Sequence, residues 1–234
     1  MQGSIVKIFV GQSKEFGIKG SRKAIDRPFL SSIGKEEVFE QVWLGKTNLS
    51  GDSQADKKVH GGPDKAVLCY CLEHYDFWKK LYGMERSSKR MGENLLISGL
   101  NEDIVCIGDE FKIGDVARVQ ISEYRMPCWK LGRYWGVKAL PKQVQDTGKM
   151  GWYMRVIAEG FIEKGQQMVL VNRPLPKWTV AKINRKLYIE KEDLEAAKEL
   201  VASPYLSEAA KKPFAKRIEA LPASSDEKRL FGMP

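Results

Sequence analysis

Long apolar runs, histidine and cysteine are all scarce in this 234-residue sequence. A membrane-spanning helix needs about 18 consecutive apolar residues, and no segment approaches that length. The first six residues lack the basic start and the long apolar stretch of a secretory signal. We therefore expect a cytoplasmic protein that makes no membrane contact.

Several common enzyme signatures are missing as well. The sequence has no complete Gly-x-x-x-x-Gly-Lys-Ser/Thr loop and no Gly-x-Gly-x-x-Gly fingerprint between a strand and a helix. It also lacks a Gly-x-Ser-x-Gly nucleophile elbow. These absences argue against a P-loop nucleotide hydrolase, a dinucleotide-binding domain and an α/β-hydrolase.

Acidic residues are outnumbered by basic ones, 30 to 39, which gives a net charge of +9. The excess is spread along the chain, whereas a nucleic-acid-binding arm concentrates its Lys and Arg in one stretch. A local anion site, such as a phosphate pocket, fits this distribution at least as well. A nucleic-acid-binding module is the alternative, and it predicts a polynucleotide affinity that falls steeply with salt.

Short apolar runs bounded by Gly, Asn or Asp dominate the first 171 residues. Their lengths favour strands over helices. The predicted strands cover residues 4–10, 38–44, 66–72, 94–97, 110–113, 117–123 and 168–171. This spacing is typical of a barrel or sandwich, so we expect a mainly β domain with a few helices over residues 1–171.

Two helices are expected to interrupt these strands. Aromatic and apolar side chains recur at three-residue spacing over residues 73–82 and predict a helix there. A second helical pattern covers residues 142–158, although Gly148 and Gly151 lie inside it and glycine disfavours a helix.

After Pro176 the pattern becomes helical, and we place a domain boundary near Asn172. Over residues 172–234 we expect a small three-helix unit: one helix capped by Thr179, one over 191–202, and one around Phe214, Ile218 and Leu221. A proline inside a helix costs about 3 kcal/mol but is tolerated in the first turn. The third helix is therefore expected to begin at Lys212 or to kink at Pro213, and residues 224–229 are expected to be solvated.

Four cysteines are too few and too scattered for a disulfide framework. Cys69 and Cys71 alternate in an apolar run, so both sulfurs are expected on one face of a strand. Buried structural thiols are the favoured interpretation. A zinc site with His74 and His60 is the alternative, although no second close pair of ligands completes it.

The loop that contains His60 carries residues suited to anion binding. His60 precedes Gly61 and Gly62, and glycine lets the backbone approach a ligand closely. Backbone N–H groups in such a loop can cradle an anion, with help from the neighbouring cations Lys57, Lys58 and Lys65. A hydrophilic turn with a hydrogen-bonded histidine is the structural alternative.

Cys128 lies between two cations, Arg125 and Lys130, just after a predicted strand. Nearby positive charge favours a thiolate, the form of cysteine that attacks or binds metal. We interpret Cys128 as functional, although a lone cysteine in a loop is more often structural. A basic stretch near the N-terminus, with Lys23 and Arg27, is either a solvated loop or a phosphate clamp.

Four motifs, in order, resemble the MOSC domain family, named after the C-terminal part of molybdenum-cofactor sulfurases. The similar stretches are Asp56 to Asp64, Gly92-Glu93-Asn94-Leu95, Pro127 to Leu131 and Thr147 to Trp152. The similarity is closest to the YiiM-like branch, whose members also carry a short C-terminal three-helix unit. The resemblance covers essentially the whole chain.

The resemblance implies a MOSC-type β-barrel whose pocket binds the molybdenum cofactor, a phosphorylated pterin that holds the metal through two sulfurs. Cys128 would add a thiolate, a soft ligand that suits such a metal. His60 would bond to the cofactor or substrate and assist proton delivery, since an unperturbed imidazole titrates near neutrality. The implied cofactor-binding residues are Lys23, Arg27, Lys57, His60, Gly61, Gly62, Asn94, Arg125, Cys128 and Lys130, with Tyr153 and Arg155 as further candidates.

The YiiM-like branch is associated with resistance to N-hydroxylated purines such as 6-hydroxylaminopurine, and its relatives include the mitochondrial amidoxime-reducing component. The resemblance thus implies reduction of N-hydroxylated compounds to amines. Because the chain has no flavin, haem or iron–sulfur motif, a separate reductase, a flavoprotein, is expected to supply electrons. The alternatives are a cofactor carrier or sulfur-transfer protein with a persulfide on Cys128, and a thiol hydrolase that uses Cys128 with His60.

Two residues depart from the pattern of the branch. Trp129 stands where tyrosine is frequent, which affects packing over the pocket but not metal ligation. Pro213 interrupts a helix that is continuous in relatives, which puts the shape of the C-terminal unit in doubt.

Overall fold

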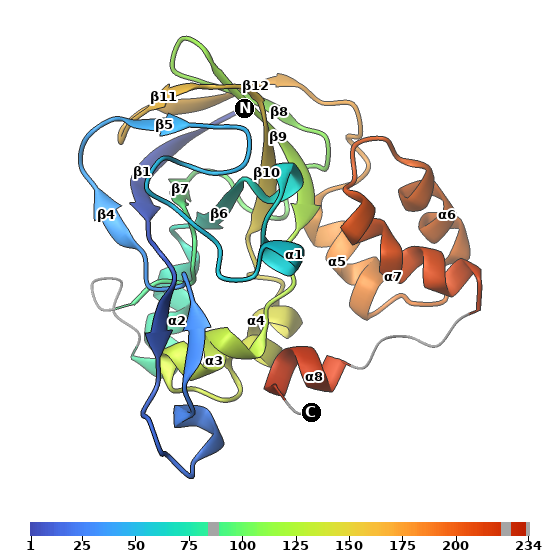
Figure 1. Ribbon diagram of the computed structural model, residues 1–234. Helices are drawn as coiled ribbons and strands as arrows, with labels where there is room; N and C mark the ends of the chain where they lie inside the picture. Colours follow the sequence, from blue (N-terminus) through green and yellow to red (C-terminus); the bar gives the residue numbers. More distant parts are fainter. Residues whose placement is uncertain (84–88, 221–225, 233–234) are drawn as a thin grey trace.

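The computed structural model describes residues 1–83, 89–220 and 226–232. Within these residues, seven strands close into a barrel in the order β1–β12–β8–β9–β10–β6–β7, and β7 pairs back with β1 (Figure 1). Only β6 and β7 pair in parallel among these seven. The strands are β1 (Gln2–Val10), β6 (Val67–Cys71), β7 (Leu95–Ser98), β8 (Glu110–Ile113), β9 (Ala117–Tyr124), β10 (Trp152–Ala158) and β12 (Gln167–Asn172). The expected mainly β barrel is confirmed.

Shorter strands extend the barrel at its margins. β4 (Glu36–Val38) pairs with β1, and β5 (Val42–Leu44) pairs with β11 (Gly160–Ile162). The single strand predicted over 38–44 is therefore wrong, because an exposed segment at residues 39–41 separates β4 from β5.

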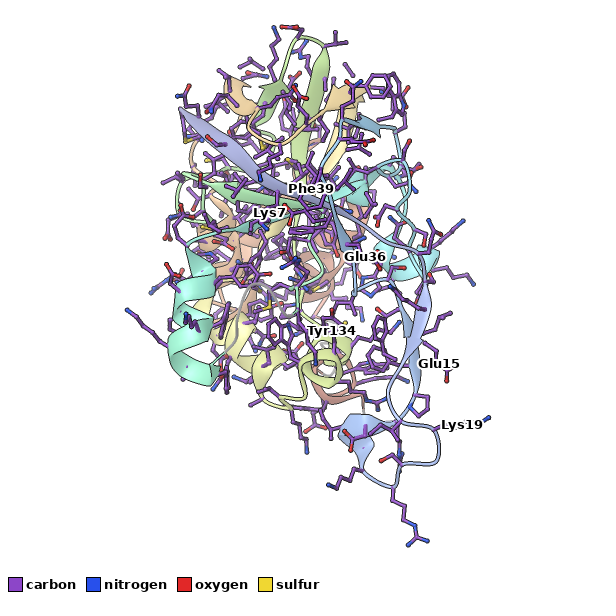
Figure 2. The ribbon with its side chains drawn as sticks, turned by 90° about the vertical axis from the view of Figure 1, so that its left-hand side faces the viewer. Lys7, Glu15, Lys19, Glu36, Phe39 and Tyr134 are labelled. Carbon is purple, nitrogen blue, oxygen red and sulfur yellow. The ribbon has the colours of Figure 1, made fainter. Side chains whose placement is uncertain are left out.

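A hairpin of β2 (Lys14–Phe16) and β3 (Phe29–Ser31) projects from the barrel, and its connection includes the 3-10 helix η1 (Ala24–Asp26). Figure 2 shows Lys19 near the far end of this projection. Aromatic contacts anchor the hairpin, in which the Phe16 ring lies 5.3 Å from the ring of Tyr134.

Short helices fill the space between the strands. They are α1 (Lys57–His60), the 3-10 helix η2 (Pro63–Lys65), α2 (His74–Tyr82), α3 (Trp129–Trp135) and α4 (Leu140–Thr147), and Figure 1 shows α2, α3 and α4 gathered at one end of the barrel. The helix predicted over 73–82 is confirmed by α2, which buries Tyr75 and Trp78.

The helix predicted over 142–158 is wrong beyond Thr147. Gly148 ends α4 in the left-handed region, with φ 71°, and Gly151 has φ 79°. A side chain at Gly151 would place its Cβ 2.3 Å from the carbonyl oxygen of Cys69. The chain must therefore turn at these glycines, and it continues as β10.

Strand β6 is buried on both of its faces. Cys69 packs into the barrel core, whereas its neighbour Tyr70 belongs to a second cluster with Trp78 of α2. Cys69 and Cys71 are both buried, which confirms their interpretation as buried thiols.

Three helices follow the barrel and confirm the expected C-terminal unit: α5 (Val180–Tyr188), α6 (Leu194–Ala202) and α7 (Glu208–Ile218). Thr179 caps α5, as expected, by accepting the backbone N–H of Lys182. The expected start of the last helix at Lys212 is wrong, because Ser207 caps α7 and Pro213 lies inside it. The boundary near Asn172 stays a prediction.

A further helix, α8 (Asp226–Phe231), follows this unit. It buries Leu230, whereas Glu227 and Lys228 are exposed and Asp226 and Arg229 are half-buried. The solvated segment predicted over 224–229 is therefore confirmed at residues 227–228, although the chain is helical there. Leu221, Ser224 and Ser225 lie outside the described residues. None of the helices in the described ranges has the length and apolarity needed to cross a membrane.

Candidate functional site

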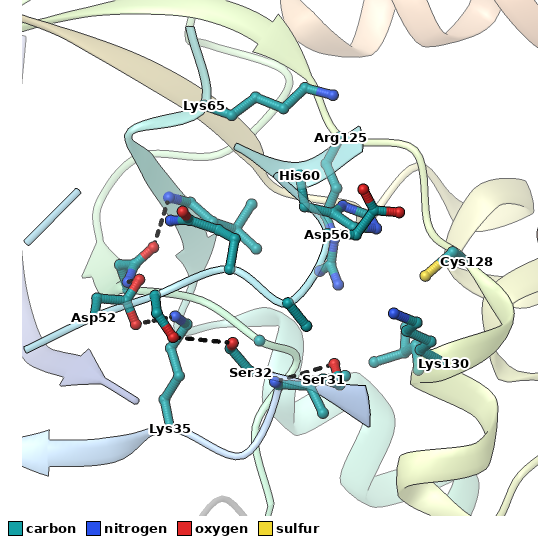
Figure 3. Close-up of a pocket in the computed structure, with 18 of the residues that line it drawn as sticks. Ser31, Ser32, Lys35, Asp52, Asp56, His60, Lys65, Arg125, Cys128 and Lys130 are labelled. Carbon is teal, nitrogen blue, oxygen red and sulfur yellow. Dashed lines mark hydrogen bonds and ion pairs between the residues drawn. The ribbon is translucent and has the colours of Figure 1, made fainter. Parts of the chain in front are cut away.

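A pocket of about 720 Å³, including space open to solvent, lies between the base of the N-terminal hairpin, α1 and the start of α3 (Figure 3). Seven of the residues singled out in the sequence line this pocket: His60, Lys65, Asn94, Arg125, Cys128, Lys130 and Tyr153. The lining extends from Ser31 to Tyr153, so the fold brings together segments that lie up to 122 positions apart in the chain.

Cys128 occupies the N-cap position of α3, where its carbonyl accepts the backbone N–H of Leu131 at 3.0 Å. Its side chain is half-buried and points into the pocket near Lys130 (Figure 3). The other three cysteines of the chain are buried. Cys128 is thus the cysteine that a ligand in the pocket can reach.

Two cations close to Cys128 bond to backbone carbonyls. Arg125 donates to the carbonyl oxygens of Met150, at 3.3 Å, and Met91, at 2.5 Å. Lys130 donates to the carbonyl oxygen of Leu30 at 3.0 Å. A neutral carbonyl satisfies a hydrogen bond without cancelling a positive charge, so this side of the pocket attracts anions.

His60 is neutral at neutral pH. Burial is the main cause that lowers the pKa of its imidazole from 6.5 to about 4, and the positive charges of Lys65, Lys130 and Arg125 contribute to this shift against the opposing effect of Asp56. The expected proton delivery rested on an unperturbed pKa and does not apply to this environment. The neutral ring offers one N–H donor and one nitrogen acceptor to a ligand.

Lys65 and Tyr153 line the same pocket as His60. Lys65 donates to the carbonyl oxygen of Val59 at 2.8 Å, lies 3.0 Å from a carboxylate oxygen of Glu123, and sits 5.5 Å from the centre of the Tyr153 ring. Burial raises the pKa of Tyr153 to about 12. Its hydroxyl therefore keeps its proton at neutral pH and can donate a hydrogen bond.

The opposite side of the pocket contains an ion pair that the sequence interpretation missed. Lys35 and Asp52 are in direct contact, with side chains only 6% and 1% exposed. Asp52 also accepts the backbone N–H of Gly11 at 2.9 Å and the side-chain amide of Asn94 at 2.9 Å. Only the fold reveals this pair, because Lys35 and Asp52 lie 17 positions apart in the chain.

Asn94 has an architectural role in this structure. Its amide nitrogen donates to the carbonyl oxygen of Phe9 and to Asp52, and its amide oxygen accepts the backbone N–H of Leu68. Both amide hydrogens are used within the protein, so Asn94 joins β1, β6 and the Asp52 loop behind the pocket wall.

The other predicted cofactor-binding residues lie outside the lining: Lys23, Arg27, Lys57, Gly61 and Gly62, together with Arg155. Lys23 and Arg27 flank η1 and are exposed. Arg155 pairs with Asp64 at 2.8 Å.

Local backbone geometry explains the two glycines. A Cβ at Gly61 would lie 2.9 Å from the carbonyl oxygen of Lys57, and Gly62 has φ 93°. The N–H groups of Lys58 and Val59 already bond to Asp56, which caps α1. The N–H groups of Lys58 and Val59 are therefore not free to bind an anion, and the expected anion cradle elsewhere in this loop stays a prediction.

The donor set suits a metal that arrives with its own ligands. Among the described residues, no group of three or more His, Cys, Asp or Glu side chains converges to hold a metal ion. Cys128 offers one soft ligand, and the lining combines four cations, Lys35, Lys65, Arg125 and Lys130, with two carboxylates, Asp52 and Asp56. The residues present therefore fit an anionic cofactor that already carries its metal.

Comparison with known proteins agrees with this geometry. The MOSC domain model matches residues 56–169, and the model of the YiiM-like 3-alpha helix domain matches residues 178–221. The chain belongs to the YiiM-like branch of the MOSC family.

Relatives of this MOSC protein include an uncharacterised protein of Bacillus subtilis, YflK, which is 40% identical over 82% of this chain and 86% of its own length. The crystal structure of YiiM from Geobacillus stearothermophilus has 36% identity and a TM-score of 0.76, over 92% of this chain and 99% of that one. A protein of Gibberella moniliformis named "Reductase" is 34% identical over 78% of this chain but only 32% of its own length.

Proposed function

We propose that this pocket binds the molybdenum cofactor, that Cys128 is the protein ligand to molybdenum, and that the protein reduces N-hydroxylated compounds to amines. One observation carries the proposal: a single half-buried thiol faces a cationic pocket, and among the described residues no three His, Cys, Asp or Glu side chains converge to hold a metal ion by themselves. Membership of the MOSC family, whose domains bind this cofactor, supports it.

Different pocket residues would bind different parts of such a cofactor. Arg125 and Lys130 suit the anionic groups, since Arg and Lys are the usual partners of phosphate oxygens. Ser32 and Ser53 offer hydroxyls to the polar edges of a pterin from the opposite wall. Cys128 supplies the sulfur.

The proposed reaction converts R–NHOH, two electrons and two protons into R–NH₂ and water. The bound cofactor supplies the two-electron chemistry. Within the pocket, the neutral His60 ring can accept a hydrogen bond from the substrate hydroxyl, and Tyr153 can donate one. Leu68, Met126 and Leu131 contribute an apolar lining that limits water.

Two electrons must reach the cofactor after each turnover. This chain has no flavin, haem or iron–sulfur motif of its own, so the proposal includes a separate reductase, a flavoprotein. The Gibberella protein named "Reductase" supports this idea, because about two thirds of its length lies outside the match and can contain further modules.

The experiment is Cys128→Ala in protein produced by a host that makes the cofactor. Molybdenum content and the reduction of 6-hydroxylaminopurine with a chemically reduced viologen are measured together. We expect both to fall at least tenfold, which corresponds to about 1.4 kcal/mol. Cys106→Ala is the matched control, because it removes a thiol that is buried and outside the pocket lining.

Retention of both metal and activity in Cys128→Ala would refute the proposal. Wild-type protein that binds molybdenum but reduces no N-hydroxylated substrate would favour the cofactor carrier. A persulfide on Cys128 in metal-free, folded protein would favour sulfur transfer.

A further inference from the structure

Helix α8 returns from the C-terminal unit to the barrel and lies against α3 and α4 (Figure 1). Its Leu230 is 3% exposed. Gly232, just after the helix, has φ 64°, and a Cβ there would lie 2.9 Å from Cγ of Trp129. Gly232 therefore packs closely on the residue that follows Cys128.

Arg229 makes a second contact, on the other side of the same cysteine. It donates to the carbonyl oxygen of Pro127 at 2.5 Å and to the side-chain oxygen of Gln145 at 2.5 Å. It also pairs with Asp226 of its own helix at 2.7 Å. One guanidinium thus ties the residue before Cys128 to both α4 and α8.

These two contacts hold the residues on either side of Cys128, Pro127 and Trp129. Pro127 has a fixed φ and no N–H, so its carbonyl is the polar backbone group through which the segment before Cys128 can be held. The carbonyl of Cys128 itself is bonded to Leu131 within α3. The peptide groups on either side of the sulfur therefore have defined partners, and one of these partners is Arg229.

We propose that α8 is a clamp that sets the position of Cys128, with Arg229 as its positioning residue. Arg229 lies outside the pocket lining and acts through the Pro127 carbonyl. The claim that this clamp aids metal binding rests on the proposed function. Its effect on the position of the Cys128 sulfur does not. The clamp gives the last helix a defined role in a chain whose pocket lies mainly in the barrel.

The test is the native-state alkylation rate of Cys128 in full-length protein made without the cofactor. Iodoacetamide is a suitable probe because the other three cysteines are buried. We expect Arg229→Ala to raise the alkylation rate about fivefold at pH 8, because the released segment exposes the half-buried sulfur more often. Mass spectrometry after proteolysis confirms the alkylated residue.

Two variants separate positioning from general effects. Arg229→Lys keeps the charge and one donor, so its alkylation rate should lie between those of wild type and Arg229→Ala. Lys228→Ala removes an equal charge from an exposed position on the same helix and should leave the rate unchanged. Hydrogen exchange should rise in Arg229→Ala over residues 126–132, while the barrel strands keep their protection.

An alkylation rate in Arg229→Ala equal to that of wild type, or altered to the same extent in Lys228→Ala, would overturn the clamp. If Arg229→Ala is poorly folded, Arg229→Lys replaces it in this test. An alkylation rate of Arg229→Lys equal to that of wild type would then overturn the clamp. The proposed function fails separately: it falls if Cys128→Ala keeps its molybdenum, whatever the alkylation rates show.

Discussion

The two walls of the pocket both contain lysine, but their electrostatics differ. On one wall, Lys35 pairs with the carboxylate of Asp52, and both side chains are almost fully buried. On the other wall, Arg125 and Lys130 bond to neutral backbone carbonyls. The first wall is electrically balanced, and the second keeps its positive charge.

The balanced wall therefore serves to hold the fold together, and the cationic wall serves to attract a ligand. The Lys35–Asp52 pair and its bonds to Gly11 and Asn94 connect chain segments behind the pocket. The carbonyl-bound cations, together with Cys128, face the open volume. Mutations in the two walls should therefore affect different quantities, stability in one case and anion binding in the other.

The largest effect is expected for Asp52→Asn, on the balanced wall. Removing one partner of a buried ion pair leaves an uncompensated charge and typically costs about 3–5 kcal/mol. Urea unfolding should show a loss of about this size. The double variant Asp52→Asn with Lys35→Met should recover part of it, since the unpaired charge is gone. An Asp52→Asn variant as stable as wild type would remove the contrast between the walls.

On the cationic wall, Arg125→Met should reduce molybdenum loading about tenfold, an effect of about 1.4 kcal/mol. The reason is the loss of a fixed positive charge that faces the cofactor site. Lys138→Met is the control, since it removes the charge of an exposed residue outside the lining. Equal loading in both variants, measured by metal analysis of folded protein, would contradict the role assigned to this wall.

A further effect, similar in size, concerns the protonation of His60. Its folded-state pKa of about 4 is below the ordinary 6.5, so the unfolded chain binds more protons between these values. The corresponding stability is present above pH 6.5 and is lost as pH falls toward 4. Between pH 6.5 and pH 5.0, the free energy of unfolding measured in urea should fall less for His60→Gln than for wild type.

Nuclear magnetic resonance tests the same point directly. The chain has two histidines, so His60→Gln identifies the ring signal of His60. That signal should stay in its neutral position down to pH 5. A midpoint near 6.5 would show that neither burial nor the nearby cations lower the pKa of His60.

Local patterns predicted α2 and the three C-terminal helices, because their apolar side chains recur at helical spacing within a few turns. The three-residue strands β2, β3 and β11 were missed, since such short segments have no clear period and form only when a partner strand is in place. The order in which strands pair to close the barrel also depends on contacts between distant parts of the chain, so local patterns do not predict it.

The site was predictable where residues belonged to a motif. His60, Asn94 and Cys128 were found through short strings of sequence, and all three line the pocket. The Lys35–Asp52 pair was not, because its partners lie 17 residues apart and meet only through the fold. Arg229 was missed for the same reason, since it is 102 residues from Pro127.

The central claim is that the sulfur of Cys128 binds molybdenum, and X-ray absorption at the molybdenum edge tests it most directly. The account predicts three sulfur neighbours around the metal in loaded wild-type protein, two from the pterin and one from Cys128. Loaded Cys128→Ser should show two sulfurs. The same number of sulfur neighbours in both proteins would contradict the account.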